Sequence, residues 1–196
     1  EKVFQFDLPG THVADLNGDR LQDLAWIQPS RVVCFPNRGR GAFGAPIFLP
    51  ISWTLTSAEI ERSGFSDIDG DGLADLTIVG PESSPTGIAY WLNRFQNGLD
   101  GPRSVTGLPS MQSGDALRWA DMNGNGTTDV VISQAQSSPG EKILVIDLVP
   151  EGKPHLLVNI ENGLGLRITL SHESSTAQLV RAEAAGTPWT SRMPLA

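Results

Sequence analysis

Residues 67–75 read Asp-Ile-Asp-Gly-Asp-Gly-Leu-Ala-Asp, a stretch in which carboxylates alternate with small or apolar side chains. Related stretches occur at residues 15–23 (Asp-Leu-Asn-Gly-Asp-Arg-Leu-Gln-Asp) and at residues 121–129 (Asp-Met-Asn-Gly-Asn-Gly-Thr-Thr-Asp). Their starts are 52 and 54 residues apart. Self-similarity at such a period indicates a repeat architecture in which each copy forms one unit of supersecondary structure.

Each acidic stretch is followed by two apolar segments of β type, with a turn-rich gap between them. The first segments are residues 24–27, 76–79 and 130–132, and the second are residues 32–35, 88–92 and 142–146. Short strands separated by turn residues predict an all-β fold. Repeating four-stranded units of about 40–50 residues are typical of β-propeller blades. No long window shows a clean 3.6-residue period, so little helix is expected.

The acidic stretches carry oxygen ligands at a spacing that suits a hard divalent cation. Calcium takes about six to eight oxygens, and loop positions 1, 3, 5 and 9 offer side-chain oxygens while position 7 offers a backbone carbonyl. Glycine at position 4 allows the tight bend that such a loop needs. The predicted ligands are Asp15, Asn17, Asp19, Leu21 and Asp23 in the first loop, Asp67, Asp69, Asp71, Leu73 and Asp75 in the second, and Asp121, Asn123, Asn125, Thr127 and Asp129 in the third.

The three loops differ in how well they suit calcium. The second has four carboxylates and is the best candidate, the first has Arg20 at position 6 where the others have glycine, and the third has only two carboxylates. Fewer charged ligands mean weaker calcium binding. The alternative is that these runs are tight turns closed by Asx hydrogen bonds, with no cation. An EF-hand is excluded because its twelfth-position Glu is missing and the expected flanks are strands.

The segment Phe43-Gly44-Ala45-Pro46 follows the first repeat and is similar to the signature of FG-GAP (VCBS-type) repeats, the blades of integrin α-type propellers and their bacterial relatives. The resemblance covers about residues 3–155. It implies that residues 1–155 form a partial propeller of about three four-stranded blades. An FG-GAP propeller closes with more than three blades, so the others would come from chain outside this sequence or from self-association.

The repeat stops near residue 155, and residues 156–171 read as two strands joined by an Asn162-Gly163 turn, which is a strong hairpin signal. Residues 184–195 show little periodicity and are expected to be extended or disordered. Three motifs here, Ile160-Glu-Asn-Gly-Leu-Gly165, Ala185-Gly-Thr-Pro-Trp189 and Arg192-Met-Pro194, resemble the join between propeller and shell in insecticidal toxin complex B components and Salmonella virulence plasmid B-like proteins. Residues 156–196 would then be a β-hairpin and linker at the start of that shell.

The resemblance implies a secreted bacterial scaffold whose propeller docks a pore-forming A component and gates a toxin shell. The residues themselves show no catalytic motif of the Gly-x-Ser-x-Gly, His-Glu-x-x-His or P-loop type, so an enzyme is not expected. The net charge of −8 disfavours nucleic acid as a partner, and no apolar run is long enough for membrane insertion. Two alternatives stay open: a calcium-dependent adhesion or glycan-binding module, and an accessory domain of a hydrolase.

Overall fold

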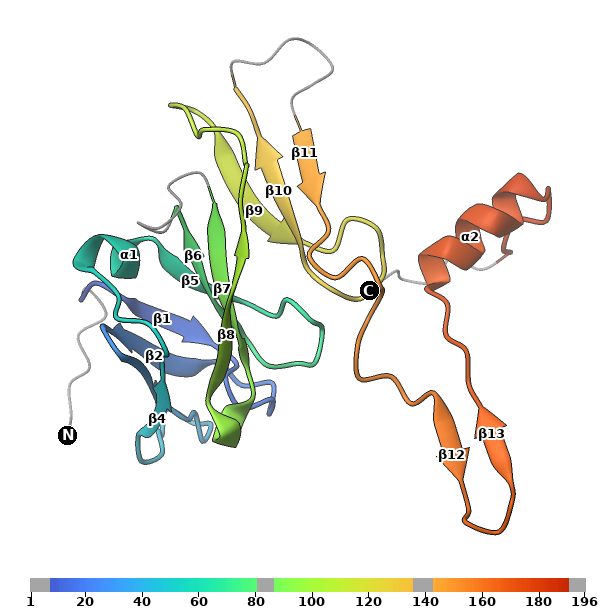
Figure 1. Cartoon of the computed structure of the whole chain (residues 1–196), viewed down its shortest axis with the longest axis horizontal. Helices are drawn as coiled ribbons and strands as arrows, with labels where there is room; N and C mark the ends of the chain where they lie inside the picture. The colour runs from blue at the N-terminus through green and yellow to red at the C-terminus, as the bar shows by residue number, and fades with distance from the viewer. Residues whose placement is uncertain (1–7, 81–86, 136–142, 191–196) are drawn as a thin grey trace.

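The computed structural model describes residues 8–80, 87–135 and 143–190. Within these residues the chain forms three antiparallel sheets in series, a separate hairpin and two α-helices (Figure 1). The elements in chain order are β1 (Thr11–Ala14), β2 (Asp23–Gln28), β3 (Arg31–Phe35), β4 (Ile47–Pro50), α1 (Ser57–Glu61), β5 (Ser63–Ser66), β6 (Asp75–Val79), β7 (Ile88–Asn93), the 3-10 turn η1 (Phe95–Asn97), β8 (Leu99–Val105), β9 (Ala116–Ala120), β10 (Asp129–Ser133), β11 (Ile143–Ile146), β12 (Asn159–Glu161), β13 (Arg167–Thr169) and α2 (Ser175–Ala184).

The sheets have the up-and-down order of propeller blades, which confirms the predicted fold class. The first sheet runs β1-β2-β3-β4 and the second β5-β6-β7-β8, each strand pairing with its neighbour in sequence. The third runs β11-β10-β9 and has three strands among the described residues, where a four-stranded blade was predicted. Each acidic loop joins the first and second strands of its sheet, as expected. The structure thus places the three loops at equivalent points of three successive blades.

The core lies between successive blades. Ile27 of the first sheet and Ile78 and Trp91 of the second belong to one buried cluster, and β1 contacts β5. Ile88 of β7 joins Val130 of β10 in a further buried cluster between the second and third sheets. Burial on both faces explains why β2 and β6 are nearly continuous apolar runs with little alternation. Face-to-face packing of this kind holds the loops of neighbouring blades side by side.

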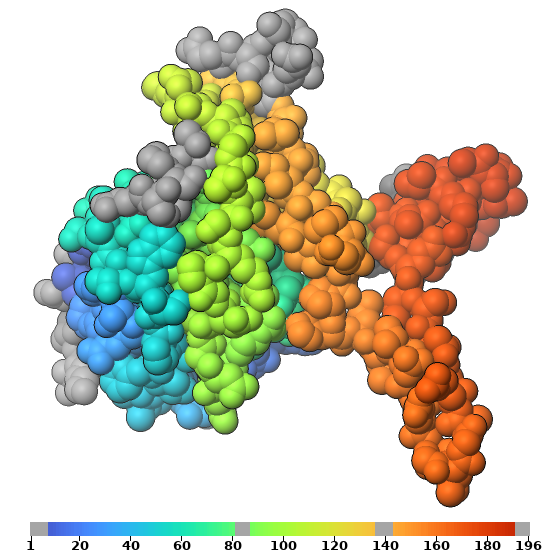
Figure 2. Space-filling model, in the orientation of Figure 1, coloured from blue at the N-terminus to red at the C-terminus, as the bar shows by residue number. Residues whose placement is uncertain are grey.

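The C-terminal hairpin stands away from the blades (Figures 1 and 2), whereas Thr176 in the first turn of helix α2 lies against Gly124 of the third acidic loop. The predicted hairpin is present as β12 and β13, with strands shorter than expected, and Asn162 Oδ1 accepts backbone N–H groups of Leu164 (2.8 Å) and Leu166 (3.1 Å) at its turn. Helix α2 follows and was not predicted. None of its residues is buried, and its sequence therefore lacks the apolar stripe from which a helix could be predicted. The motif at residues 192–194 lies outside the described residues.

No helix in the described parts of the chain has both the length and the apolar character required to cross a membrane.

Candidate cation-loop site

The first Asp of each loop sets the shape of the loop by accepting backbone N–H groups. Asp15 accepts from Gly18 and Arg20, both at 2.7 Å. Its equivalents bind their own loops in the same way: Asp67 accepts from residues 71 and 72, and Asp121 accepts from residues 124, 125 and 126. The glycines at position 4 have φ between +70° and +79° in all three loops, a conformation that favours glycine. The predicted tight bend is therefore present three times.

The last Asp of each loop is fully buried and ties the loop to the strands. Asp23 and Asp75 each accept two backbone N–H groups, one from the second loop residue and one from an Asn at or just after the end of the next strand. For Asp75 these donors are Ile68 at 2.8 Å and Asn93 at 2.7 Å. Burial raises the pKa of Asp75 to about 7, and the nearby Asp69 and Asp71 add to the rise. Asp75 therefore acts as a latch within the blade, and its predicted role as a cation ligand stays a prediction.

Asp129 forms only half of the corresponding latch. Its Oδ2 accepts the N–H of Met122 at 2.9 Å, but its buried Oδ1 has no hydrogen-bond partner among the described residues. The residue at the matching strand end is Asp147, where the other repeats have Asn37 and Asn93. Burial raises the pKa of Asp129, and the carboxylate of Asp147 raises it further.

The second loop brings carboxylates together closely enough to hold a cation. Ligand atoms of Asp67, Asp69 and Asp75 lie within 4.8 Å of one another. Asp69 is 3% exposed, and its Oδ1 is buried without a partner among the described residues. An unpaired buried carboxylate oxygen is costly, so this atom is suited to binding a cation. The residues of the second loop therefore fit calcium by ligand chemistry and by this open ligand atom.

The described residues of the first and third loops show no comparable group of three acidic ligands. In the first loop, Asp19 accepts the Leu21 N–H (2.9 Å) and an Asn17 amide N–H (3.2 Å). In the third loop, the amides of Asn123 and Asn125 donate to Asp147 at 2.9 Å and 3.5 Å. Asx hydrogen bonding of the kind expected for tight turns is present in these loops as it is in the second, and calcium binding there stays a prediction.

Position 7 of each loop is fixed through its N–H group, which donates to the side chain at position 5. The distances are 2.9 Å from Leu73 to Asp71 and 2.8 Å from Thr127 to Asn125. Coordination by the carbonyl oxygens of Leu21, Leu73 and Thr127 stays a prediction.

Consecutive loops also bind one another directly. The backbone oxygen of Asp15 accepts the N–H of Ala74 at 2.8 Å, and the backbone oxygen of Leu16 accepts the side-chain amide of Asn93 at 2.9 Å. Thr128 repeats the arrangement in the next blade, where its N–H donates to Ile68 O at 3.0 Å and its hydroxyl to the carbonyl of Asp67. Hydrogen bonds from backbone and side chains therefore link each blade directly to the next at these loops.

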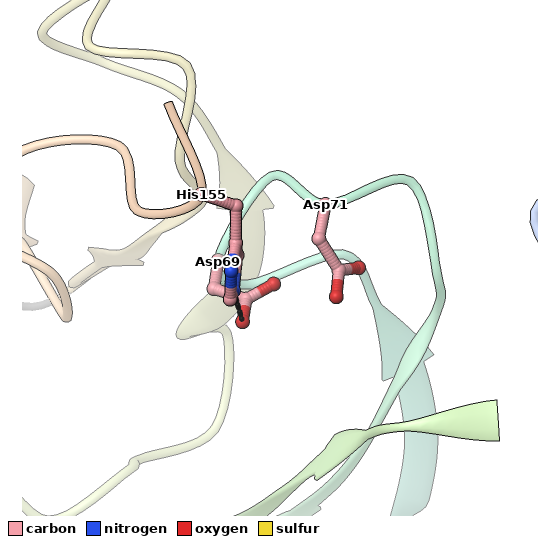
Figure 3. Close-up of side chains that lie close together, drawn as sticks. All are labelled: Asp69, Asp71 and His155. Atoms are coloured by element: carbon pink, nitrogen blue, oxygen red, sulfur yellow. Dashed lines mark hydrogen bonds and ion pairs between the residues drawn. The ribbon is translucent and has the colours of Figure 1, made fainter. Parts of the chain in front are cut away.

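Two basic side chains that sequence reasoning did not select contact the second loop from other parts of the chain. Arg94 Nη1 is 3.0 Å from Asp69 Oδ2 and 3.1 Å from Asp71 Oδ2. His155 Nε2 is 3.4 Å from Asp69 Oδ2, as the dashed line in Figure 3 shows, and Asp71 points toward the same space. A signal for Arg94 existed, because the strand-end Asn is followed by Arg in both of the first two repeats. None existed for His155, which is remote in sequence from the loop.

Comparison with known families bears on both halves of the chain. Residues 15–78 match the FG-GAP-like repeat, and residues 98–196 match the family model of the insecticide toxin TcdB middle/N-terminal region. The second match spans half of the sequence. The chain belongs to the TcdB middle/N-terminal family. The two matches confirm the resemblances to FG-GAP repeats and to toxin complex B components, and they make the chain a toxin-complex B-type scaffold region.

Solved toxin-complex structures share the fold of this TcdB-family chain. The TcdB2–TccC3 structure without its hypervariable C-terminal region is 29% identical, with a TM-score of 0.71, and the match covers 96% of this chain and 9% of that chain. The Tc holotoxin pore of Photorhabdus luminescens is 28% identical, with a TM-score of 0.69, and coverage of 93% and 8%. The chain thus spans less than a tenth of each. A comparison with curated proteins finds no match.

Proposed function

We propose that this chain is the non-enzymatic propeller and shell-entry region of a secreted bacterial toxin-complex B component, and that its propeller docks the pore-forming A component and gates the toxin shell. One observation carries the proposal: FG-GAP-like blades lead, in a single chain, into the hairpin β12–β13 that belongs to the TcdB middle/N-terminal match. Solved relatives with this arrangement include a holotoxin pore assembly. The remaining blades would come from chain beyond this sequence or from a second copy.

A structural calcium ion in the second loop is part of the same proposal. Asp67, Asp69, Asp71 and Asp75 would hold it, with the carbonyl of Leu73 completing the set of protein ligands. Support comes from the convergence of three of these carboxylates and from the unpaired Asp69 Oδ1. The first and third loops would bind calcium more weakly, because their side chains are engaged with one another. When bound, the ion neutralises the carboxylates and stabilises the loop.

Binding to the A component tests the docking function. The chain is immobilised, its β-sheet content is checked by circular dichroism, and the purified pore-forming A component is applied by biolayer interferometry. We expect saturable binding with a Kd of about 1 μM or tighter, the range of specific protein complexes. Leu164→Asp is the matched control, because Leu164 lies in the turn between β12 and β13 and is 90% exposed, and this hairpin stands away from the blades (Figure 1). This variant should bind as the unaltered chain does.

Two outcomes would contradict the docking function. If the folded chain does not bind the A component but binds sugars on a glycan array, the adhesion alternative replaces it. If Leu164→Asp abolishes binding while the fold is retained, the docking surface lies on the hairpin and not on the propeller.

A further inference from the structure

The guanidinium of Arg94 lies at the centre of three metal-ligand atoms. Its Nη1 is 3.0 Å from Asp69 Oδ2, 3.1 Å from Asp71 Oδ2 and 3.3 Å from His155 Nε2. These two carboxylates and the imidazole also form a group whose ligand atoms lie within 4.8 Å of one another. A positive group in this position interacts with the same atoms that a cation would use.

The second loop needs a neutralising positive charge more than the first and third loops do. Four carboxylates occur within nine residues, and Asp69 and Asp75 are both almost completely buried. A buried carboxylate is stable only if it is paired or hydrogen-bonded. Arg94 keeps its charge at every physiological pH and can bridge two carboxylates through its planar group. Its side chain is 27% exposed, so the ion pairs are partly shielded from water.

The first and third repeats lack this arrangement. Arg38 is the equivalent of Arg94 in the first repeat, but its side chain lies against Gly44, whose Cβ position would be 3.0 Å from Arg38 Nε. In the third repeat the equivalent residue is Leu148, which packs in the apolar cluster with Trp119. Among the described residues of the three repeats, only the loop with four carboxylates has an arginine from the strand end placed between its carboxylates.

We infer that Arg94 is the resident cation of the second loop and that calcium binds there only by displacing it. The displacement part of this inference rests on the calcium site proposed above. Calcium needs about six or more oxygens, while Arg94 occupies Asp69 Oδ2 and Asp71 Oδ2 and adds a positive charge beside any ion that enters. The unpaired Asp69 Oδ1 is the ligand atom that Arg94 leaves open.

Displacement of Arg94 would also change the contacts at the junction between the blades and the hairpin. Arg94 contacts His155, and His155 also contacts Asp69. Residue 155 directly precedes the exposed segment that leads to β12. The same three side chains therefore hold both the second loop and the start of the linker, so cation exchange at Asp69 changes how the linker is held.

Arg94→Gln tests the inference, with Arg103→Gln as the matched control. Arg103 forms an exposed ion pair with Asp100 at 3.0 Å on β8, so its loss removes an arginine without touching the loop. In EDTA we expect Arg94→Gln to lower the Tm by about 5 °C and Arg103→Gln by less than about 1 °C. Titration calorimetry with calcium chloride should show at least tenfold tighter calcium binding for Arg94→Gln, and millimolar calcium should restore its Tm.

Hydrogen exchange adds a readout of the junction. The amides of Lys153 and of residues 155–158 should exchange faster in Arg94→Gln than in Arg103→Gln when both are in EDTA. If Arg94→Gln does not fold, Arg94→Lys replaces it, because Lys keeps the charge but loses the planar fork, and it should tighten calcium binding by a smaller factor.

Three results would overturn the inference. The first is an unchanged Tm of Arg94→Gln in EDTA, which would deny the resident role. The second is calcium affinity equal to that of the Arg103→Gln control. The third is a destabilised Arg94→Gln that calcium does not restore, which would also remove the proposed calcium site while leaving docking of the A component unaffected, since docking is measured separately.

Discussion

The second and third acidic loops share a backbone shape but differ in charge. In both, the first Asp accepts N–H groups of the loop and a glycine at position 4 has positive φ. The second loop carries four carboxylates with Arg94 among them, whereas the third carries two carboxylates whose neighbouring amides bind Asp147. The shape therefore depends on positions 1 and 4 and on a side-chain oxygen at position 5, which Asp or Asn can supply, so positions 3 and 5 can differ in charge while the bend is kept.

The largest expected effect comes from the latch at position 9. Asp75→Ala removes the acceptor of two buried N–H groups and should lower the free energy of unfolding by about 3 kcal/mol. Asp129→Ala removes the acceptor of one such group and also removes an unpaired oxygen, so its cost should be about 1 kcal/mol. Urea unfolding at pH 7 in EDTA, followed by tryptophan fluorescence, measures both.

Equal losses of unfolding free energy in Asp75→Ala and Asp129→Ala would contradict the proposed difference between the two latches. They would mean that Asp129 Oδ1 acquires a partner in solution and that the third latch is as complete as the second. The Asp23 latch of the first loop is unaltered in both variants. It accepts the N–H groups of Leu16 and Asn37 and is the structural example of a complete latch.

A smaller effect is expected from pH. Burial raises the pKa of Asp75 from 3.8 to about 7, so the folded chain binds this proton more tightly than the unfolded chain does. Its contribution to stability is thus fully present below about pH 4 and is lost as pH rises through about 7. Even half of this shift is worth roughly 2 kcal/mol.

Asp75→Asn isolates that contribution because it retains the shape of the side chain without the titration. In EDTA, the unfolding free energy of the unaltered chain should fall between pH 4 and pH 8 relative to that of Asp75→Asn. Parallel pH profiles for the two proteins would show that the Asp75 carboxyl titrates in the same range in the folded and unfolded chains.

The comparison of the loops also shows what the sequence can predict. The Asp/Asn-Gly spacing predicted three hairpins in three blades, because the turn is made by side chains that bind backbone within a few residues. Arg94 and His155 could not be derived this way, since they reach Asp69 from other elements and only the packed blades bring them together. Helix α2 escaped prediction because it buries no face. That the third sheet has three strands among the described residues could not be foreseen either, since the number of strands depends on pairing partners.

The smallest effect concerns calcium itself, and it compares position 3 of the two loops. In the unaltered chain, millimolar calcium should raise the Tm over its value in EDTA by about 3 °C through mass action. Asp69→Ala should abolish more than half of this increment, because Asp69 is a charged ligand with an open oxygen. Asn123→Ala should leave most of it, since the Asn123 amide is engaged with Asp147.

Only the calcium-dependent increment is compared, since Asp69→Ala also breaks the ion pair with Arg94 and lowers the starting Tm. Equal calcium-dependent increments of Tm in the two variants would mean that calcium does not prefer either loop. A larger loss in Asn123→Ala would move the strongest site to the third loop, and the dependence of affinity on carboxylate number would then fail for this chain.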